Sequence, residues 1–258
     1  MVKNFMDLTG RVAVVVGGTS GIGRTLAVGL AEAGADVVAS GRRQNLADEV
    51  AAQIEGLGRQ TLAQTVNIQD RASVDALRDA VLAKFGHVDI LLNAAGQTHK
   101  KPTAEVDEAS WAQVLDVNLT GTLRTCQSFY QALVKSGHGR VINIASLSSF
   151  VALYQVAAYC ASKAAVLTLT KNLAIEWAKD GVCVNAISPG VFPTELNASL
   201  LNGTERGREF ISRTPMRRFG RTEELIGAAV LLASDSASFL TGQSIAVDGG
   251  FLAAGVTT

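Results

Sequence analysis

The sequence has few cysteines, few prolines and no excess of charge of either sign. Its three cysteines cannot form a closed disulfide framework, and none has a metal-ligand spacing to a histidine, so we expect no metal site. The 23 basic and 23 acidic residues argue against binding nucleic acid through overall charge. Only 4 prolines stand beside 25 glycines, so the glycines belong to particular turns rather than to a low-complexity tract.

Long hydrophobic runs are also missing. No stretch approaches the about 18 uninterrupted apolar residues of a membrane span. The amino terminus, Met-Val-Lys-Asn-Phe-Met-Asp, lacks the apolar run of a signal peptide. We therefore expect a cytoplasmic protein that does not act at a membrane. With 258 residues, 48% of them hydrophobic and 18% charged, the chain can bury a sizeable core.

What the sequence does contain is a regular alternation of short apolar runs with longer helical patterns. The runs predict strands at residues 11–16, 36–40, 61–66, 88–92, 141–144, 182–187 and 244–247. The longer patterns predict helices at about 21–34, 44–57, 70–85, 110–135, 156–179 and 223–233. Strands with continuous apolar residues, separated by crossover helices, indicate a parallel sheet covered on both faces. Because no linker interrupts the pattern, we expect one doubly wound α/β domain over residues 1–258.

The first predicted strand leads directly into a glycine-rich turn, Gly17-Gly18-Thr19-Ser20-Gly21-Ile22-Gly23, which opens a helix. A phosphate can approach a backbone without Cβ atoms, and a helix amino terminus offers free N–H groups. The glycines have the spacing G-x-x-x-G-x-G, and the lysine of a P-loop is absent. A tight turn without ligand is the alternative, but the position after the first strand favours a dinucleotide site.

The end of the second predicted strand bears on which dinucleotide is bound. An acidic residue there would accept hydrogen bonds from the adenosine ribose and repel a 2′-phosphate. This chain has Gly41 instead, followed by Arg42 and Arg43, whose guanidinium groups suit a phosphate. The alternative is that both arginines are solvated residues at a helix start. The sequence therefore predicts NADP(H) as the preferred cofactor, with NAD(H) possible.

A tyrosine and a lysine, Tyr159 and Lys163, stand four residues apart at the start of a long helical pattern, which puts both on one helix face. A free tyrosine has a pKa of about 10, and a nearby cation favours its phenolate. Ser146 follows the predicted strand at 141–144, at the sheet edge where ligands of open α/β sheets bind. Its hydroxyl can bond a substrate oxygen while Tyr159 transfers the proton.

Together these motifs resemble the short-chain dehydrogenase/reductase family over about residues 8–250. The resemblance rests on motifs that follow in the family's order: the glycine turn, Asn93-Ala94-Ala95-Gly96, Asn118 in Val-Asn-Leu-Thr-Gly, Ser146, Tyr159 with Lys163, and Ser188-Pro189-Gly190. It implies a Rossmann-like sheet of seven parallel strands and hydride transfer between nicotinamide C4 and a carbonyl or alcohol carbon. It also implies a homotetramer.

The resemblance assigns a role to each matching position. Tyr159 would be the general acid/base, and Ser146 would donate to the substrate oxygen. Lys163 would bind the nicotinamide ribose and lower the pKa of Tyr159, while Asn118 would hold a water in the proton relay. The cofactor would contact the glycine turn and further segments, in all Gly17, Thr19, Ser20, Gly21, Ile22, Gly23, Arg42, Arg43, Asn67, Ile68, Asn93, Ala94, Gly96, Tyr159, Lys163, Pro189, Gly190, Val191 and Thr194.

Three positions depart from the family pattern. Val16 stands where threonine is common, Ala94 replaces a second asparagine, and Asn67 replaces the aspartate that contacts adenine. The glycine turn also lacks the basic residue of some NADP-preferring members, which leaves Arg42 and Arg43 to carry the cofactor prediction. No departure removes a catalytic group.

The substrate is predicted less closely than the chemistry. We expect a substrate lid at about residues 192–218. The carboxyl-terminal half is most similar to family members of the gluconate 5-dehydrogenase type, which implies a small polyhydroxy acid, keto sugar acid or polyol. The alternative is a 3-oxoacyl-carrier-protein reductase, although Gly137 and Asp180 stand where those enzymes have basic docking residues. An alternative of another class is a protein that senses NADP(H) without turnover.

Overall fold

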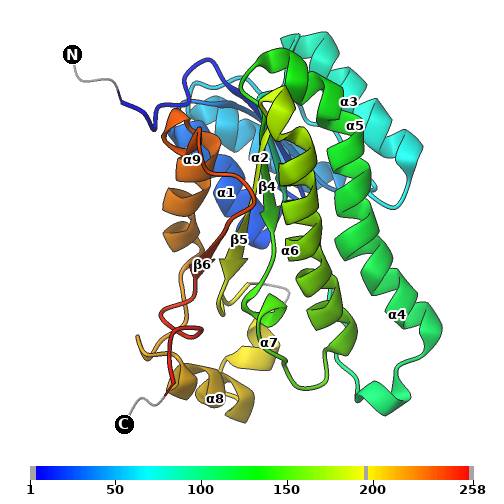
Figure 1. Cartoon of the computed structure of the whole chain (residues 1–258), viewed down its shortest axis with the longest axis vertical. Helices are drawn as coiled ribbons and strands as arrows, with labels where there is room; N and C mark the ends of the chain where they lie inside the picture. Colours follow the sequence, from blue (N-terminus) through cyan, green and yellow to red (C-terminus); the bar gives the residue numbers. More distant parts are fainter. Residues whose placement is uncertain (1–3, 195–196, 256–258) are drawn as a thin grey trace.

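A parallel sheet forms the centre of the computed structural model, which describes residues 4–194 and 197–255 (Figure 1). Its six strands lie in the order β2-β1-β3-β4-β5-β6. They are β1 (Val12–Val16), β2 (Asp36–Ser40), β3 (Ile90–Asn93), β4 (Arg140–Ile144), β5 (Cys183–Pro189) and β6 (Ser244–Val247). The α/β fold with a parallel sheet is confirmed. The chain after β1 leads to one side of that strand and β3 lies on the other, so the strand order reverses there.

The prediction of a seventh strand is wrong, because residues 61–66 form none. The segment runs beside β2 and bonds it by backbone groups near its two ends: Val37 donates to the Gln60 carbonyl at 3.0 Å, and Val66 donates to that of Gly41 at 2.9 Å. Between them the N–H of Gln64 turns back to the Leu62 carbonyl at 3.1 Å. The Ser40 hydroxyl donates to the Gln64 carbonyl. The backbone groups of this segment that a regular parallel ladder with β2 would need are therefore bonded elsewhere.

Helices cover both faces of the sheet because successive strand residues point to opposite sides. Ala13 and Val15 join one hydrophobic cluster, with α1 (Gly21–Glu32), α2 (Gln44–Gly56) and α9 (Ile226–Ala233). Val12, Val14 and Val16 join the other, with α3 (Arg71–Phe85), α5 (Gly121–Ser136) and α6 (Ala157–Trp177). Figure 1 shows α1 and α9 on one side of the strands and α3, α5 and α6 on the other.

The long helix predicted at 110–135 is divided in the structure. It consists of α4 (Glu108–Leu115), a π-helical segment (Asp116–Thr120) and α5. The Gly121 N–H donates to the Asp116 carbonyl, five residues back, so the backbone is locally wider than an α-helix. Short helices α7 (Ala198–Leu201) and α8 (Glu205–Arg213) occupy the segment predicted as a lid. Among the described residues, no helix is long and apolar enough to cross a membrane.

Candidate active site

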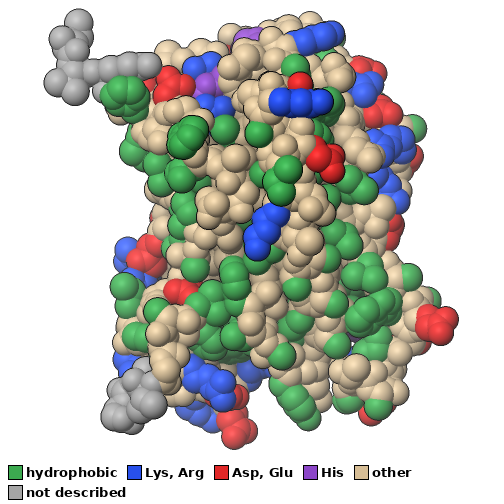
Figure 2. Space-filling view, viewed as in Figure 1, with side chains coloured by type: hydrophobic (Ala, Val, Ile, Leu, Met, Phe, Trp, Pro, Cys, Tyr) green, Lys and Arg blue, Asp and Glu red, His purple; other side chains and the backbone are tan. Residues whose placement is uncertain are grey.

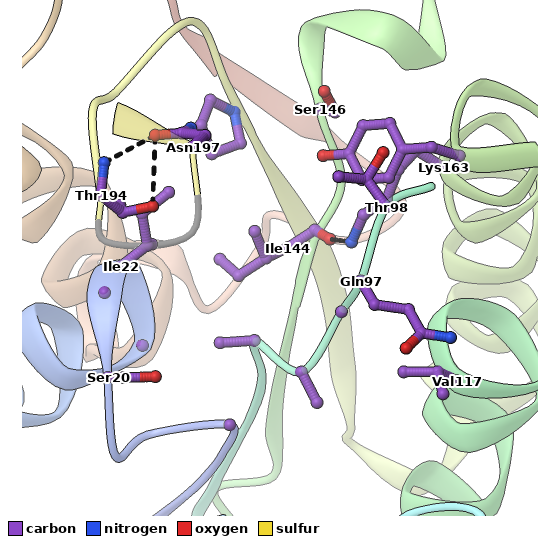
Figure 3. Close-up of a pocket in the computed structure, with 18 of the residues that line it drawn as sticks. Ser20, Ile22, Gln97, Thr98, Val117, Ile144, Ser146, Lys163, Thr194 and Asn197 are labelled. Carbon is purple, nitrogen blue, oxygen red and sulfur yellow. Dashed lines mark hydrogen bonds between the residues drawn. The ribbon is translucent and has the colours of Figure 1, made fainter. Parts of the chain in front are cut away.

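A cleft of about 940 Å³ opens at the carboxyl ends of the strands, where the strand order reverses. The ends of β1, β4 and β5 form its floor through Val16, Ile144 and Pro189. The glycine turn borders it on one side and the start of α6 on the other (Figure 3). Open α/β sheets bind ligands at this position, so this cleft is the candidate active site.

All but two of the predicted site residues line this cleft. Those that do are Gly17, Thr19, Ser20, Gly21, Ile22, Gly23, Arg42, Arg43, Asn67, Ile68, Ala94, Gly96, Ser146, Tyr159, Lys163, Pro189, Gly190, Val191 and Thr194. Asn93 and Asn118 are outside the lining. The sequence therefore predicted residues from distant parts of the chain that the fold brings to one cavity.

The glycine turn packs too closely on its surroundings for side chains. Gly17 has φ +81°, and a Cβ there would lie 2.4 Å from the Ala95 nitrogen. A Cβ on Gly23 would lie 2.0 Å from the Gly17 carbonyl oxygen. Ser20, the residue that begins α1, makes no side-chain capping bond, and the first turn of α1 has no acidic residue. The amino terminus of α1 is thus left free for an anion.

The other end of the cleft is basic and has no room for an acidic side chain after β2. A Cβ on Gly41 would lie 2.4 Å from Oγ1 of the buried Thr19. Arg42 and Arg43 are exposed and make no ion pair among the described residues. The helix that follows, α2, begins after Arg43 with no side-chain cap and no acidic residue in its first turn. This corner of the cleft therefore suits an anion as well.

Ser146, Tyr159 and Lys163 meet at the opposite end of the cleft. Ser146 is 6% exposed, and its Oγ accepts the Ser148 N–H at 3.1 Å. Lys163 is 4% exposed and its Nζ donates to the Ile144 carbonyl at 2.7 Å, as the dashed line in Figure 3 shows. The same ammonium lies 5.8 Å from the centre of the Tyr159 ring. The predicted catalytic group is assembled by β4 and the first turns of α6.

Burial changes the pKa of both titratable groups. It lowers the pKa of Lys163 from 10.5 to about 8. It raises the pKa of Tyr159, and a hydrogen bond with Ser146 offsets part of that rise. The Lys163 ammonium, which bonds the Ile144 carbonyl, lies over the same Tyr159 ring.

Asn118 is fully buried in the π-helical segment, and its amide is committed to the protein. Its Oδ1 accepts the Gln97 N–H at 2.8 Å, and its Nδ2 donates to the Gln97 carbonyl and to Ser162 Oγ, each at 2.9 Å. Gln97 itself lines the cleft. The Asn118 side chain thus fixes the loop after β3.

Asn93, predicted to contact the cofactor, lies behind the cleft wall with its side chain bonded within the protein. Its Nδ2 donates to Asn143 Oδ1 at 2.9 Å, and its Oδ1 accepts from the Thr125 hydroxyl at 2.7 Å. Asn143 in turn donates to the Thr170 hydroxyl at 2.9 Å. This buried chain of hydrogen bonds ties β3 and β4 to α5 and α6, so Asn93 supports the cleft from beneath.

The sequence did not single out most residues at the substrate end of the cleft. They come from the loop after β3, the loop before α6 and the region of α7 and α8, and include Gln97, Thr98, Lys100, Leu153, Phe192, Asn197, Leu201, Arg206 and Phe210. His99 is exposed and outside the lining. The spacing of Arg206 and Phe210, one helical turn apart, was the signal that could have revealed the inner face of α8.

Comparison with known proteins gives matches along nearly the whole chain. A family model described as enoyl-(acyl carrier protein) reductase matches residues 16–252. A 2-dehydro-3-deoxy-D-gluconate 5-dehydrogenase of Dickeya dadantii (strain 3937) is 39% identical over 256 residues, 98% of this chain and 100% of that protein. An NAD-dependent glycerol dehydrogenase of Listeria innocua is 37% identical over 249 residues, 96% of each chain.

A solved structure is equally similar. It is that of a gluconate 5-dehydrogenase from Burkholderia cenocepacia J2315 in complex with NADP and tartrate. It has a TM-score of 0.94 and 37% identity, and the match covers 98% of this chain and 99% of that one. From the extent of these matches, and from the serine, tyrosine and lysine gathered at the cleft, the chain belongs to the short-chain dehydrogenase/reductase family of oxidoreductases.

Proposed function

We propose that the protein is an NADP(H)-preferring dehydrogenase that interconverts a carbonyl and a secondary alcohol in a small sugar acid, keto acid or polyol. The observation that carries the proposal is the single cleft that holds Ser146, Tyr159 and Lys163 at one end and two uncapped helix starts at the other. The named relatives, which are sugar-acid and polyol dehydrogenases, support the substrate class.

The residues of the cleft fit a nicotinamide dinucleotide. The free amino terminus of α1, reached through a turn without side chains at Gly17 and Gly23, suits the pyrophosphate. Asn67 and Ile68 would hold the adenine, and Pro189 to Val191 with Thr194 would line the nicotinamide. When bound, the cofactor would exchange a hydride with the substrate carbon at nicotinamide C4.

The protein's own groups would handle the substrate oxygen and its proton. The Oγ of Ser146 accepts the Ser148 N–H, and its own O–H, which bonds Tyr159 here, would turn to donate to that oxygen. Burial raises the pKa of Tyr159, so its phenol stays protonated near neutral pH and can serve as the acid in the reductive direction. The Lys163 ammonium donates one N–H to the Ile144 carbonyl and would donate its other two to the nicotinamide ribose.

A preference for NADP(H) is proposed from the corner after β2. Gly41 leaves no carboxylate to repel a 2′-phosphate, and Arg42 and Arg43 line the cleft without ion pairs among the described residues. The relative crystallised with NADP agrees with this preference, while the NAD-dependent relative shows that the family also includes members that use NAD.

The carrier-protein reductase remains the alternative activity, and the surface of α5 and α6 disfavours it. Asp180, where a basic docking residue would be needed, accepts the Tyr130 hydroxyl at 2.6 Å. The Tyr130 ring lies tilted against that of Trp177, with the ring centres 4.5 Å apart. Asp180 therefore leaves a carboxylate where an acidic carrier would approach.

A homotetramer, which the family resemblance implies, is also proposed. Val166, Leu173 and Trp177 of α6 are buried within the subunit. Among its large apolar side chains, α6 leaves Ile175 78% exposed. Figure 2 shows few charged side chains on the face of the molecule along which α6 runs. Sedimentation of wild-type protein and of Ile175→Glu tests it: dissociation of the variant supports a subunit contact there, and a monomeric wild type contradicts it.

The decisive experiment for the activity is NADPH oxidation with two carbonyl compounds. We expect kcat/KM to be much higher for 5-ketogluconate than for an acetoacetyl thioester. The reverse preference would identify a carrier-protein reductase. Tight NADPH binding without turnover on a broad panel of carbonyl compounds would instead support the sensing protein, and would contradict the proposed dehydrogenase.

A further inference from the structure

The cleft is lined by five basic side chains and, among the described residues, by no acidic one. Three of the five have a place in the proposed chemistry: Arg42 and Arg43 at the adenosine end and Lys163 beside Tyr159. The other two, Lys100 and Arg206, are not needed for cofactor binding or proton transfer. A cleft whose fixed charges have one sign attracts ligands of the other sign, so these two residues raise the question of a second anion.

One turn of the chain is bonded both to Arg206 and to the backbone of the residue after Lys100. Tyr154 and Gln155, in the loop before α6, present successive carbonyl groups. The Tyr154 carbonyl accepts from Arg206 Nη1 at 3.1 Å, and the Gln155 carbonyl accepts from the backbone N–H of Lys101 at 2.8 Å. Lys100 and Arg206 are therefore attached to neighbouring points at the mouth of the cleft, close in the chain to Tyr159.

Arg206 is held there without a partner of opposite charge. It is the second residue of α8, at the positive end of the helix, where a cation is unfavourable. Its guanidinium bonds the neutral Tyr154 carbonyl and lies 5.5 Å from the centre of the Phe210 ring. Among residues 4–194 and 197–255 it makes no ion pair. A ligand carboxylate in place of the Tyr154 carbonyl would accept two hydrogen bonds from the Arg206 guanidinium. Such a charged, bidentate pair is stronger than a single bond to a neutral carbonyl.

Lys100 completes the arrangement. It is exposed at the cleft mouth and makes no hydrogen bond or ion pair within the described chain. Its neighbour Lys101 differs, since its ammonium lies 3.9 Å from Asp107 and is outside the cleft lining. Gln97 and Thr98, earlier in the same loop, line the cleft with polar groups suited to hydroxyls.

We propose that Arg206 and Lys100 form a carboxylate subsite, so that the enzyme selects polyhydroxy or keto acids over neutral polyols. The inference rests on the proposed function and decides between the two substrate classes that the relatives represent. In it, Arg206 exchanges the Tyr154 carbonyl for the substrate carboxylate, and Lys100 adds a second positive charge.

D-gluconate and D-glucitol test the subsite, because they share a carbon chain and differ by a carboxylate against a hydroxymethyl group. With NADP⁺, the wild type should prefer gluconate. Arg206→Gln and Lys100→Gln should each reduce kcat/KM for gluconate, by about 10- to 100-fold for Arg206, mainly through KM. Both should reduce kcat/KM for glucitol much less than for gluconate, because glucitol has no carboxylate.

Arg208→Gln is the matched control. Arg208 lies on the same helix, is exposed, bonds the Gly203 carbonyl at 3.3 Å and is outside the cleft lining. This variant should keep the wild-type preference for gluconate. A loss equal to that of Arg206→Gln would mean that the charge of α8 in general, rather than a subsite, attracts the acid, and would overturn the proposal.

Calorimetry of gluconate binding to the NADP⁺ complex separates this inference from the proposed function. Gluconate that binds to the wild type and not to Arg206→Gln, without being oxidised, supports the subsite and contradicts the dehydrogenase proposed above. Equal use of gluconate and glucitol by the wild type overturns the subsite and leaves the dehydrogenase standing. Unchanged gluconate binding in Arg206→Gln overturns it as well.

Discussion

The two ends of the cleft are built in different ways. The cofactor end consists of turns that join central strands to helices, and backbone contacts such as that of Gly17 on Ala95 fix its shape. The substrate end consists of a loop after β3, a loop before α6 and the short helix α8, joined by single hydrogen bonds such as Arg206 to Tyr154. The strand ends and the long helix α6 therefore fix the proposed catalytic group, whereas the proposed substrate end is built from loops and a short helix attached to that frame.

Of the effects expected on cofactor binding, the largest comes from a change in the glycine turn. In Gly23→Ala the new Cβ would lie 2.0 Å from the Gly17 carbonyl oxygen, so the turn must shift. We expect the free energy of unfolding to fall by about 1–3 kcal/mol and NADPH affinity to fall about 100-fold, measured by urea unfolding and fluorescence titration. Gly56→Ala is the control, because a Cβ there meets nothing within 4 Å. Equal results for the two variants would contradict the close packing of the turn.

The next effect sharpens the cofactor end without moving its backbone. Arg42→Ala removes a guanidinium that the proposal pairs with the 2′-phosphate. We expect KM for NADPH to rise about 10- to 100-fold, with little change for NADH, which lacks that phosphate. Steady-state kinetics with both cofactors measure this, and a loss of equal size for NADH would remove the phosphate assignment.

Lys163, at the end of the cleft that holds Ser146 and Tyr159, predicts a pH dependence of stability. Because its pKa is lowered to about 8 in the folded protein, its charge destabilises the fold below that pH. The penalty, about 3 kcal/mol, is relieved as pH rises from about 8 towards the unfolded value of 10.5. Urea unfolding of wild type and Lys163→Met between pH 7 and pH 10 should show the wild type gaining stability relative to the variant. A difference independent of pH would contradict a buried ammonium.

The smallest effect concerns the substrate end. Thr204 caps α8 by accepting the Gly207 N–H at 3.0 Å. Thr204→Ala should weaken this helix locally by about 1 kcal/mol, raise the substrate KM a few-fold and leave NADPH affinity unchanged. Thr204→Ser keeps the capping oxygen and should behave as wild type. A change in NADPH affinity in Thr204→Ala would show that the two ends are not separate.

The sequence predicted the cofactor end well because that end depends on local patterns. The glycine turn, the strand before it and the helix after it are adjacent in the chain, and the structure confirms β1 and α1 there. A strand at 61–66 was predicted from the same kind of pattern, and that prediction is wrong. The hydroxyl of Ser40 on β2 donates to the Gln64 carbonyl, which a ladder between the two segments would need.

The substrate end could not be predicted in the same way. Arg206 lies 52 positions from the carbonyl it bonds, and no periodicity in either segment encodes that contact. Asn93 and Asn118 were found as motif residues, but the sequence does not reveal that both side chains turn away from the cleft. Whether a polar side chain faces a ligand or a buried partner depends on the packing of other elements, here α5 and α6.

The account depends most on Tyr159 as the proton donor in an NADPH-linked reduction. The most direct test is to bind NADPH to wild type and to Tyr159→Phe, add 5-ketogluconate, and follow oxidation of the bound cofactor. We predict rapid oxidation by the wild type and a rate about 100- to 10,000-fold lower in the variant, with equal NADPH affinity. Oxidation at the wild-type rate by Tyr159→Phe would contradict the account.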